Sequence, residues 1–363
     1  MAALSRIAVV AIAIAWLPAA VGAQPTRAAG PAKHHFQAKA MGTVVDITVW
    51  TSDNVSAKLA SQAAFDEFER IDLLMTTWVD TSAVSVLNAA AGGAAVPVGP
   101  EIFALLELGQ SVAQLSSGAF DLTVGAYRGL WKFDEDLDGS LPDDKDVVAR
   151  KRLTGWRGLV LDRKAKAARL KKKGMAITLG GIAKGYAVDR AAAILRERGL
   201  SSFIVQAGGD LYVSGSKDGE RWRVGIRDPR GSREATFAIT EVEDATFSTS
   251  GDYERGFVKD GVRYHHILDP RTGRPATKSR SVTVMAKRAV VADAWSTALF
   301  VLGPDKGLPL VDKNPALEAV FVDDKNQLRT SRGFTLVEGN PRVEIDKGLL
   351  GRILILSKPT PGP

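Results

Sequence analysis

The sequence predicts an α+β fold: one large mixed domain, residues 36–345, of mostly antiparallel strands with packed helices. Two stretches, 56–78 and 100–116, carry apolar residues at three- and four-residue spacing, which is typical of amphipathic helices. The strand-like runs occur in pairs between the helices, which favours α+β over a regular doubly wound sheet. The 363 residues contain no internal repeat and no low-complexity linker, so one domain is preferred over two.

The N-terminus has the pattern of a secretory signal peptide. Arg6 precedes an apolar stretch over 7–20, and the small residues of Val21-Gly22-Ala23 follow. We expect residues 1–23 to be cleaved off near Ala23. The alternative is an uncleaved anchor, for which the apolar stretch is short.

The two ends of the mature chain are predicted to lie outside the domain. Residues 24–35 are rich in Ala, Pro and Gly and are expected to form a flexible tether. His34 and His35 fall in this tether, so we do not expect them to be catalytic. Residues 346–363 are expected to be a C-terminal tail.

Composition limits the class of function. The chain has no cysteine, which excludes disulfides, zinc–thiolate sites and thiol nucleophiles. No integral membrane span is expected after signal removal, because no later apolar run reaches about 18 residues. The net charge of +7 is mild and no basic stripe with interleaved aromatics occurs, so nucleic acid is not an expected partner. We expect a soluble periplasmic protein whose modest positive field favours an anionic ligand.

In the first part of the chain, the alternating run 45–49 indicates a strand. Met41-Gly42-Thr43 interrupts the segment just before it, where the glycine permits a close backbone approach. The helix over 56–78 should pack its apolar stripe into the core. Trp78, at the end of this helix, could pack there or face a cleft.

The helix over 100–116 leads into a loop of small residues, 117–125. Gly118 is the expected C′ residue that ends the helix. The loop also holds one aromatic residue and one carboxylate, Phe120 and Asp121.

The middle of the chain has the order strand, helix, strand, strand. A short strand over 176–179 leads into the glycine loop 180–185, which opens a helix over 187–198. Such a loop at a helix N-terminus is a context for phosphate binding. Its spacing matches neither of the common phosphate-loop patterns, so a purely structural turn stays open. Lys184 adds a cation that could contact a phosphate. The strands that follow are predicted over 203–206, 211–213 and 222–226.

Asp293 and Thr297 form a candidate cation site at the start of a helix predicted over 294–302. Residues four apart share one helix face, so the carboxylate and the hydroxyl could hold one ion, with Ser296 alongside. Oxygen ligands suit Mg²⁺ or Ca²⁺ rather than zinc, and a site with few protein ligands fits Mg²⁺ better. The alternative is that Asp293 is only an N-cap.

A histidine pair, His265-His266, lies in a strand predicted over 261–268. Side chains alternate along a strand, so only one of the two can face a given cleft. His266 is closer to the turn Asp269-Pro270-Arg271-Thr272-Gly273 and is our candidate acid/base, because imidazole titrates near neutral pH. A hydrogen-bonded structural histidine is the alternative. Further strands are predicted over 281–285, 319–322 and 334–337.

Several long motifs in a fixed order carry a resemblance to a known family. They are the following: Met41-Gly42-Thr43, Ser117-Gly118-Ala119-Phe120-Asp121, the run from Leu179 to Asp189, Gly208-Gly209-Asp210, Thr249-Ser250-Gly251-Asp252-Tyr253, HHILDPRTGRP and ADAWSTALFVLG. Over about residues 36–340 the chain resembles the ApbE family of FAD:protein FMN transferases. The resemblance implies a Mg²⁺-dependent enzyme that cleaves the FAD pyrophosphate. It would attach FMN by a phosphoester to a Thr or Ser of a partner flavoprotein and release AMP.

The resemblance also implies roles for individual residues. His266 matches the histidine that activates the acceptor hydroxyl. Gly181, through its carbonyl, matches a Mg²⁺ position together with Asp293 and Thr297, and Ser296 stands where some members have an acidic ligand. The positions that match FAD contacts are Met41, Trp78, Ala119, Phe120, Asp121, Thr178, Lys184 and Leu268.

Two departures from the family pattern are visible. Thr178 stands where members usually have Asp, which changes one polar contact to FAD, and the lipobox cysteine of many members is absent. Two other functions remain open: a periplasmic FAD pyrophosphatase that yields FMN and AMP, and a non-catalytic flavin-binding protein. The first shares every residue named above, and the sequence does not select the acceptor protein.

Overall fold

The computed structural model describes residues 30–133, 136–232, 234–338, 352–355 and 359. The predicted signal peptide lies outside these residues. The described part is a mixed fold of helices packed on mostly antiparallel sheet, which confirms the predicted α+β class.

An eight-stranded sheet forms the centre of the molecule. Its strand order is β1-β2-β6-β7-β10-β15-β16-β17, and every neighbouring pair is antiparallel. The strands are β1 (Ala32–Ala40), β2 (Thr43–Thr51), β6 (Phe203–Ala207), β7 (Asp210–Ser214), β10 (Ala245–Gly251), β15 (Ser279–Ala286), β16 (Glu318–Asp323) and β17 (Leu328–Thr330).

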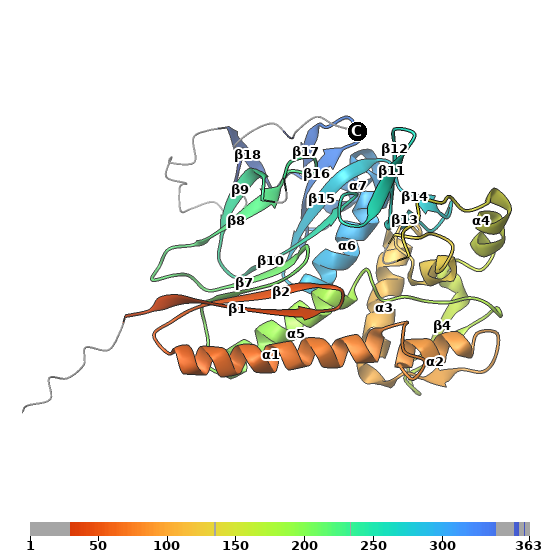
Figure 1. Cartoon of the computed structure of the whole chain (residues 1–363), viewed down its shortest axis with the longest axis horizontal. Coiled ribbons are helices and arrows are strands. Elements are labelled where there is room, and N and C mark those ends of the chain that lie inside the picture. The colour runs from red at the N-terminus through yellow and green to blue at the C-terminus, as the bar shows by residue number, and fades with distance from the viewer. Residues whose placement is uncertain (1–29, 134–135, 233, 339–351, 356–358, 360–363) are drawn as a thin grey trace, which may run out of the picture.

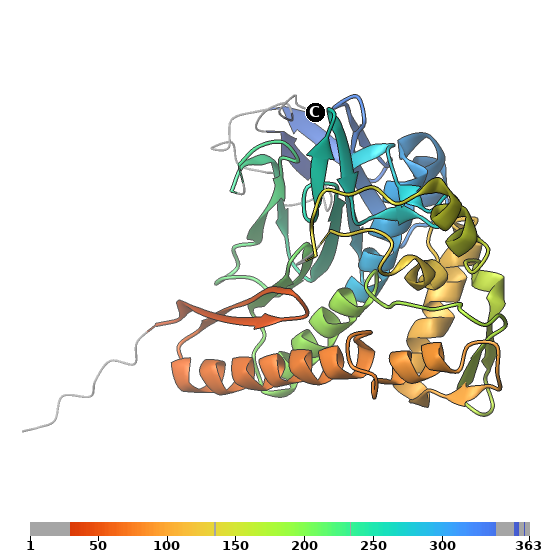
Figure 2. The same cartoon turned by 45° about the vertical axis from the view of Figure 1, so that its right-hand side comes forward.

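Three helices pack against this sheet and against one another. α1 (Asn54–Met75) lies under the β1–β2 hairpin, α5 (Ala183–Glu197) packs on β6 and β7, and α6 (Ala289–Leu302) packs on β10 and β15 (Figures 1 and 2). In α1 the predicted stripe explains the packing, because Phe68 and Ile71 are fully buried. α6 is buried on nearly all sides, since α3 (Gly99–Leu115) and α7 (Pro304–Val311) also contact it.

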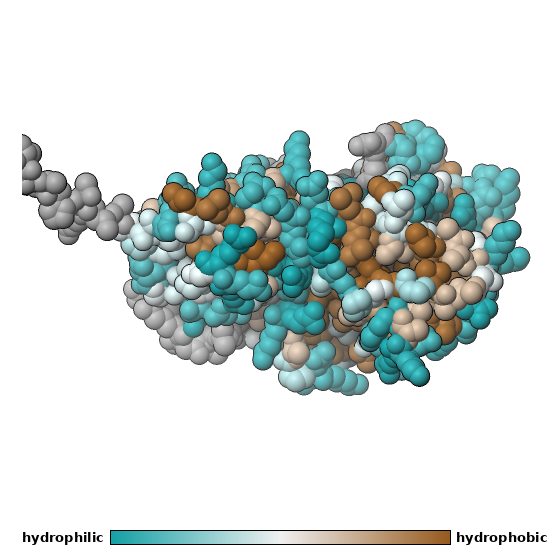
Figure 3. All heavy atoms as spheres, turned by 90° about the horizontal axis from the view of Figure 1, so that it is seen from below, coloured by the Kyte–Doolittle hydropathy of each residue, from teal (hydrophilic) through white to brown (hydrophobic). Residues whose placement is uncertain are grey.

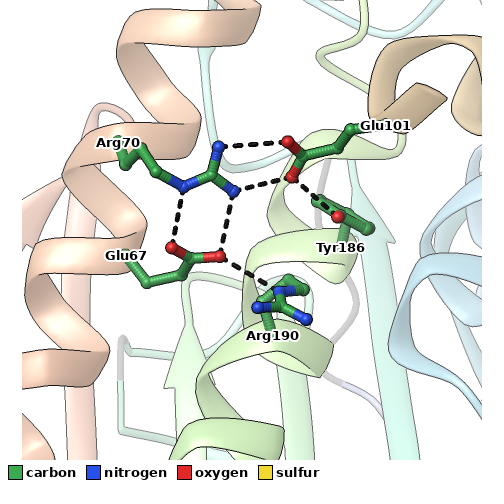
Figure 4. Close-up of polar contacts among 5 residues, drawn as sticks. All are labelled: Glu67, Arg70, Glu101, Tyr186 and Arg190. Atoms are coloured by element: carbon green, nitrogen blue, oxygen red, sulfur yellow. Dashed lines mark hydrogen bonds and ion pairs between the residues drawn. The ribbon is translucent and has the colours of Figure 1, made fainter. Parts of the chain in front are cut away.

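A charged network joins α1, α3 and α5 at their surface (Figure 4). The Arg70 guanidinium donates to Glu67 at 2.8 and 2.9 Å and to Glu101 at 3.0 and 2.7 Å. The Tyr186 hydroxyl donates to Glu101 at 2.7 Å, and Arg190 donates to Glu67 at 3.0 Å. Bidentate pairs of this kind are the geometry in which surface ion pairs contribute most to the stability of the fold.

Smaller elements surround the central layers. A four-stranded sheet has the order β18-β19-β9-β8, and two hairpins and a three-stranded sheet lie elsewhere. The remaining elements are α2 (Ala83–Ala89), β3 (Val96–Pro97), η1 (Leu122–Tyr127), α4 (Asp144–Lys151), η2 (Trp156–Gly158), β4 (Leu159–Asp162), β5 (Ala167–Leu170), β8 (Trp222–Arg227), β9 (Thr236–Val242), β11 (Gly256–Lys259), β12 (Val262–His265), β13 (Leu268–Asp269), β14 (Arg274–Pro275), β18 (Thr335–Glu338) and β19 (Arg352–Ile355).

The face that carries α1 is mixed in polarity. Val55, Leu59 and Leu73 on this helix are mostly exposed. Seen from below, hydrophobic residues form separate patches among hydrophilic ones (Figure 3). Within the described ranges, no helix combines the length and the apolar character that crossing a membrane requires.

The predicted limits of the domain are too narrow at both ends. β1 begins at Ala32, so His34 and His35 lie in a strand and not in the predicted tether 24–35. Full-length pairing with β2 provides partners for this backbone. β19 lies inside the predicted tail 346–363, where it pairs with β18 and β9.

Hydrogen bonds from distant side chains to the backbone explain two further corrections. The strand predicted over 176–179 does not form, because Ile177 exchanges hydrogen bonds with the Asn88 side chain, at 2.7 and 2.9 Å, instead of with another strand. α6 begins at Ala289, five residues before the predicted start. Asp189 caps it by accepting from the amides of Ala289 and Val290 at 2.7 and 3.1 Å.

Three other boundaries differ from the prediction. α5 starts at Ala183, within the glycine loop. The strand predicted over 261–268 is two strands, and His266 lies in the bend between β12 and β13. α3 ends in a Schellman motif whose C′ residue is Ser117, with φ of 54°, rather than Gly118.

Candidate active site

One cavity of about 860 Å³ lies where the β1–β2 turn, the loop after α3, the start of α5 and the segment around His266 converge. Cavities of several hundred Å³ are typical of small-molecule sites. Most of the predicted site residues line it: Met41, Ala119, Phe120, Asp121, Thr178, Gly181, Lys184, His266, Leu268, Asp293 and Thr297. Trp78 and Ser296 do not.

The β1–β2 turn forms one rim of the cavity. Its two central residues, Met41 and Gly42, have φ of 51° and 69°, the signature of a type I′ hairpin turn. A positive φ is unfavourable for methionine, so another contact must hold the turn. The Asp72 carboxylate supplies it by accepting from the Met41 amide at 3.1 Å. Asp72 also lines the cavity, and no sequence signal singled it out.

The crossing of α5 and α6 places the candidate cation ligands. A Cβ on Gly185 would lie 2.4 Å from the Ala289 carbonyl oxygen and 2.8 Å from the Asp293 Cβ, so only glycine allows this approach. Because the two helices approach so closely here, the Gly185 amide donates a hydrogen bond to Asp293 Oδ2 at 3.0 Å. Gly181 is less tightly enclosed: its added Cβ would lie 3.1 Å from the Phe120 ring and 3.5 Å from the Thr297 hydroxyl oxygen.

Asp293 is therefore not an N-cap. It lies in the second turn of α6, with 3% of its surface exposed, and it faces the cavity. Burial, followed by the nearby Asp210 carboxylate, raises the pKa of Asp293 well above the ordinary range. A buried carboxylate without a full countercharge is a position at which a cation would be stabilised.

Lys184 links Asp293 to a second buried carboxylate. Its Nζ lies 2.9 Å from Asp210 Oδ2 and 3.8 Å from Asp293 Oδ2. Burial lowers the pKa of Lys184, but the two carboxylates outweigh this effect, so the net shift is upward and the ammonium is charged. Asp210 follows the Gly208-Gly209 turn, which was noted only as part of a motif.

Ser296 lies behind the cavity wall. It is fully buried, and its hydroxyl donates to the Asp293 carbonyl oxygen at 2.9 Å. Its oxygen then accepts from Ser250, 2.8 Å away, and Ser250 lies 3.4 Å from the Thr297 hydroxyl. Ser250 and Thr297 line the cavity, so Ser296 orients their hydroxyls from behind instead of facing a ligand.

The two histidines have different environments, as predicted, although His266 lies in the bend after β12 and not in a strand. His265 is 2% exposed and bonds to the Ala276 carbonyl oxygen at 2.8 Å, so it is structural. His266 is half-buried at the cavity wall, and its Nδ1 lies 3.3 Å from the Arg255 carbonyl oxygen. A carbonyl only accepts, so Nδ1 carries the proton and Nε2 keeps a lone pair. Burial and then the Arg255 cation lower the pKa of His266 to about 3, so the ring is neutral.

An aromatic cluster supports the hairpin that precedes His266. Phe257 of β11 and Tyr264 of β12 stack with ring centroids 5.4 Å apart. Trp131 stacks on Tyr264 at 6.0 Å, and Phe133 lies 6.1 Å from Phe257. The hairpin therefore packs against the 131–133 segment, which fixes the two residues that flank it, Arg255 and His266.

Other predicted contacts have different surroundings. Trp78 lies beyond the end of α1 with 76% of its surface exposed, and the Arg128 guanidinium sits 4.1 Å from its ring centre. Asp121 lines the cavity, but one of its oxygens accepts from the amide and hydroxyl of Thr123 at 2.8 and 2.7 Å. The Thr178 hydroxyl accepts from the Gly180 amide at 3.2 Å and so shapes the glycine loop.

The fold and the cavity define a class: α+β domains in which one large pocket combines a neutral histidine with buried carboxylates and hydroxyls. The model of the ApbE family matches residues 41–321, and the chain belongs to this family. This confirms the resemblance predicted from the motifs.

Curated relatives and solved structures agree with this assignment. The chain is 35% identical over 310 residues to a protein of Treponema pallidum, covering 81% of this chain and 85% of the relative. It is 30% identical over 336 residues to a protein of Escherichia coli K12, covering 90% and 94%. Both relatives are named FAD:protein FMN transferase.

Two solved structures share the fold. The ApbE protein of Thermotoga maritima superimposes with a TM-score of 0.76 at 34% identity, over 83% of this chain and 97% of that one. The flavin transferase ApbE of Vibrio cholerae gives 0.75 at 28% identity, over 83% and 98%.

Proposed function

We propose that this protein is a Mg²⁺-dependent FAD:protein FMN transferase. It would cleave the FAD pyrophosphate, attach FMN to a Thr or Ser hydroxyl of a partner flavoprotein and release AMP. One observation carries the proposal: a neutral histidine and a buried, oxygen-rich cluster face the same cavity of about 860 Å³. The names of the relatives supply the substrate class.

The residues present fit a small hard cation. Asp293, Thr297 and the Gly181 carbonyl offer only oxygen atoms, and the buried Asp293 carboxylate shares the Lys184 ammonium, 3.8 Å away, with the closer Asp210. Within the described residues, no three His, Cys, Asp or Glu side chains are grouped so that they could hold a metal. A cation at this site would therefore be held by few protein ligands. When bound there, Mg²⁺ would neutralise pyrophosphate charge and stabilise the departing phosphate oxygen.

His266 would act as the general base. Its Nε2 would take the proton of the acceptor hydroxyl as that oxygen bonds to the phosphorus of the FMN half. The bond from this phosphorus to the bridging oxygen breaks, and AMP leaves with the electron pair. Lys184, charged and at the cavity wall, would contact the phosphates.

The flavin and adenine halves would be held by the remaining walls. Met41, Ala119, Phe120 and Leu268 give apolar contacts, and Asp121 and Thr178 give polar ones. A contact from Trp78 would require the segment after α1 to move, because the ring lies outside the cavity lining. We further propose that the mature chain, after cleavage near Ala23, acts in the periplasm.

One incubation tests the proposal. Mature protein is mixed with FAD, Mg²⁺ and a domain bearing an acceptor threonine, and flavin fluorescence is followed on a denaturing gel. A fluorescent acceptor band and equimolar AMP are expected. Free FMN and AMP without a labelled acceptor would show a pyrophosphatase instead, and unchanged FAD would show binding alone. His35→Ala, at an exposed histidine outside the cavity, is the matched control for His266→Ala.

A further inference from the structure

We propose that Asp210 is a positioning residue for the cation site: it receives the Lys184 ammonium when a divalent cation binds at Asp293. The inference rests on the proposed function, because it assumes that Asp293 is a cation ligand. It gives a role to a buried carboxylate that the mechanism above does not use.

Geometry already favours Asp210 as the partner of Lys184. The ammonium lies 2.9 Å from Asp210 Oδ2 but 3.8 Å from Asp293 Oδ2, so it is bonded to the first and only near the second. Lys184 sits in the first turn of α5, where the adjacent Gly185 amide holds Asp293 Oδ2 at 3.0 Å. The lysine and the cation would therefore compete for the same carboxylate.

Asp210 is held in place independently of any ligand. It is the first residue of β7, and its neighbour Gly209 packs so tightly that an added Cβ would lie 2.4 Å from the Thr249 carbonyl oxygen. The Gly209 carbonyl oxygen accepts from the Thr249 amide at 2.9 Å. The Asp210 side chain is 1% exposed, and its second oxygen, Oδ1, has no hydrogen-bond partner among the described residues. That oxygen is a second acceptor to which the ammonium could donate.

Charge balance gives the reason for a second carboxylate. Without Asp210, the pair of Lys184 and Asp293 would have no net charge. A divalent ion bound at Asp293 would then lie close to an ammonium whose only counterion it had taken. The Arg255 cation, which acts against the charged form of Lys184, would add to the repulsion. With Asp210 present, Lys184 keeps an ion-pair partner while the Asp293 carboxylate coordinates the cation. Asp210 thus keeps the Lys184 ammonium from competing with the cation for Asp293, although Asp210 itself does not contact the ion.

The test is Mn²⁺ binding to the mature chain without FAD, measured by the electron paramagnetic resonance of free Mn²⁺. Mn²⁺ accepts the oxygen ligands that suit Mg²⁺. Asp210→Asn should weaken Mn²⁺ binding about 10- to 100-fold, the range typical of outer partners of metal ligands. Lys184→Met should bind Mn²⁺ at least as tightly as the wild type. The double variant should recover the affinity of Lys184→Met.

Recovery separates this role from a merely structural one. If Asp210 only supported the fold, removing Lys184 as well would not restore binding, and a double variant as weak as Asp210→Asn would overturn the inference. Unchanged binding in Asp210→Asn would also overturn it. If Asp210→Asn does not fold, Lys184→Met alone still tests the inference: weaker Mn²⁺ binding than in the wild type would overturn it. Failure of the cation site itself looks different: the wild type would not bind Mn²⁺, or Asp293→Asn would bind it equally well.

Discussion

Gly185→Ala tests whether the crossing of α5 and α6 builds the site. The new Cβ would lie 2.4 Å from the Ala289 carbonyl oxygen and 2.8 Å from the Asp293 Cβ, so the two helices must separate. Overpacking costs about 1–3 kcal/mol. A weakened bond from the Gly185 amide to the Asp293 carboxylate costs about 1.5–3 kcal/mol more. Alanine returns about 1 kcal/mol of helix propensity. The net loss is about 1.5–5 kcal/mol.

Calorimetry and Mn²⁺ titration measure the two consequences of this substitution. For a domain of roughly 300 residues, about 1.5 °C of Tm corresponds to 1 kcal/mol, so Tm should fall by about 2–8 °C. Mn²⁺ affinity should fall as well, because Asp293 is displaced. Gly109→Ala is the matched control, since the added Cβ of this helical glycine would meet the side chain of Leu122 and not backbone. A Gly185→Ala protein with unchanged Tm and unchanged Mn²⁺ affinity would refute the reasoning.

Four further predictions concern His266 and α6. His266→Ala should lower FMN transfer about 10²- to 10⁴-fold while FAD binding, followed by flavin fluorescence, stays intact; full activity would exclude the base. Because burial lowers the pKa of His266 to about 3, transfer at saturating Mg²⁺ should show no loss with a pKa near 6.5, and a clear inflection there would contradict the neutral ring. The folded-state pKa lies below the unfolded one, so this group's stability contribution is complete above about pH 6.5 and is lost as pH falls toward 3. The Tm of His266→Gln should therefore depend less on pH than that of the wild type below pH 6.5. Asp189→Ala should cost about 1–2 kcal/mol, because it removes the acceptor for two amides at the start of α6, and an unchanged Tm would argue against the cap.

Features set by neighbouring residues were predictable from the sequence. The stripe with Phe68 and Ile71 placed α1, and the alternation around His266 separated it from the buried His265. Met41-Gly42 was recognised as an interruption of the segment before β2, although not as the turn that joins β1 to β2. Each of these depends on residues that are close together in the sequence.

Features set by distant residues were not predictable. The true start of α6 depends on Asp189, a hundred residues before it in the chain, so Asp293 was placed at a helix end instead of in its second turn. The strand over 176–179 was lost to a side chain, Asn88, that no periodicity reveals. Spacing alone also did not show that Ser296 points away from the cavity and Thr297 into it.

The network of Figure 4 has a consequence for how much ordering ligand binding requires. The first turn of α5 is fixed from two sides: the Gly185 amide bonds inward to Asp293, and the Tyr186 hydroxyl bonds outward to Glu101 and so to Arg70. Groups held in their working positions before a ligand arrives lose little conformational entropy when it binds. The helix start that carries Lys184 is pre-organised in this way from the protein surface. Replacing Arg70, which does not line the cavity, by a residue without these bonds would therefore show up as a larger entropic penalty on ligand affinity.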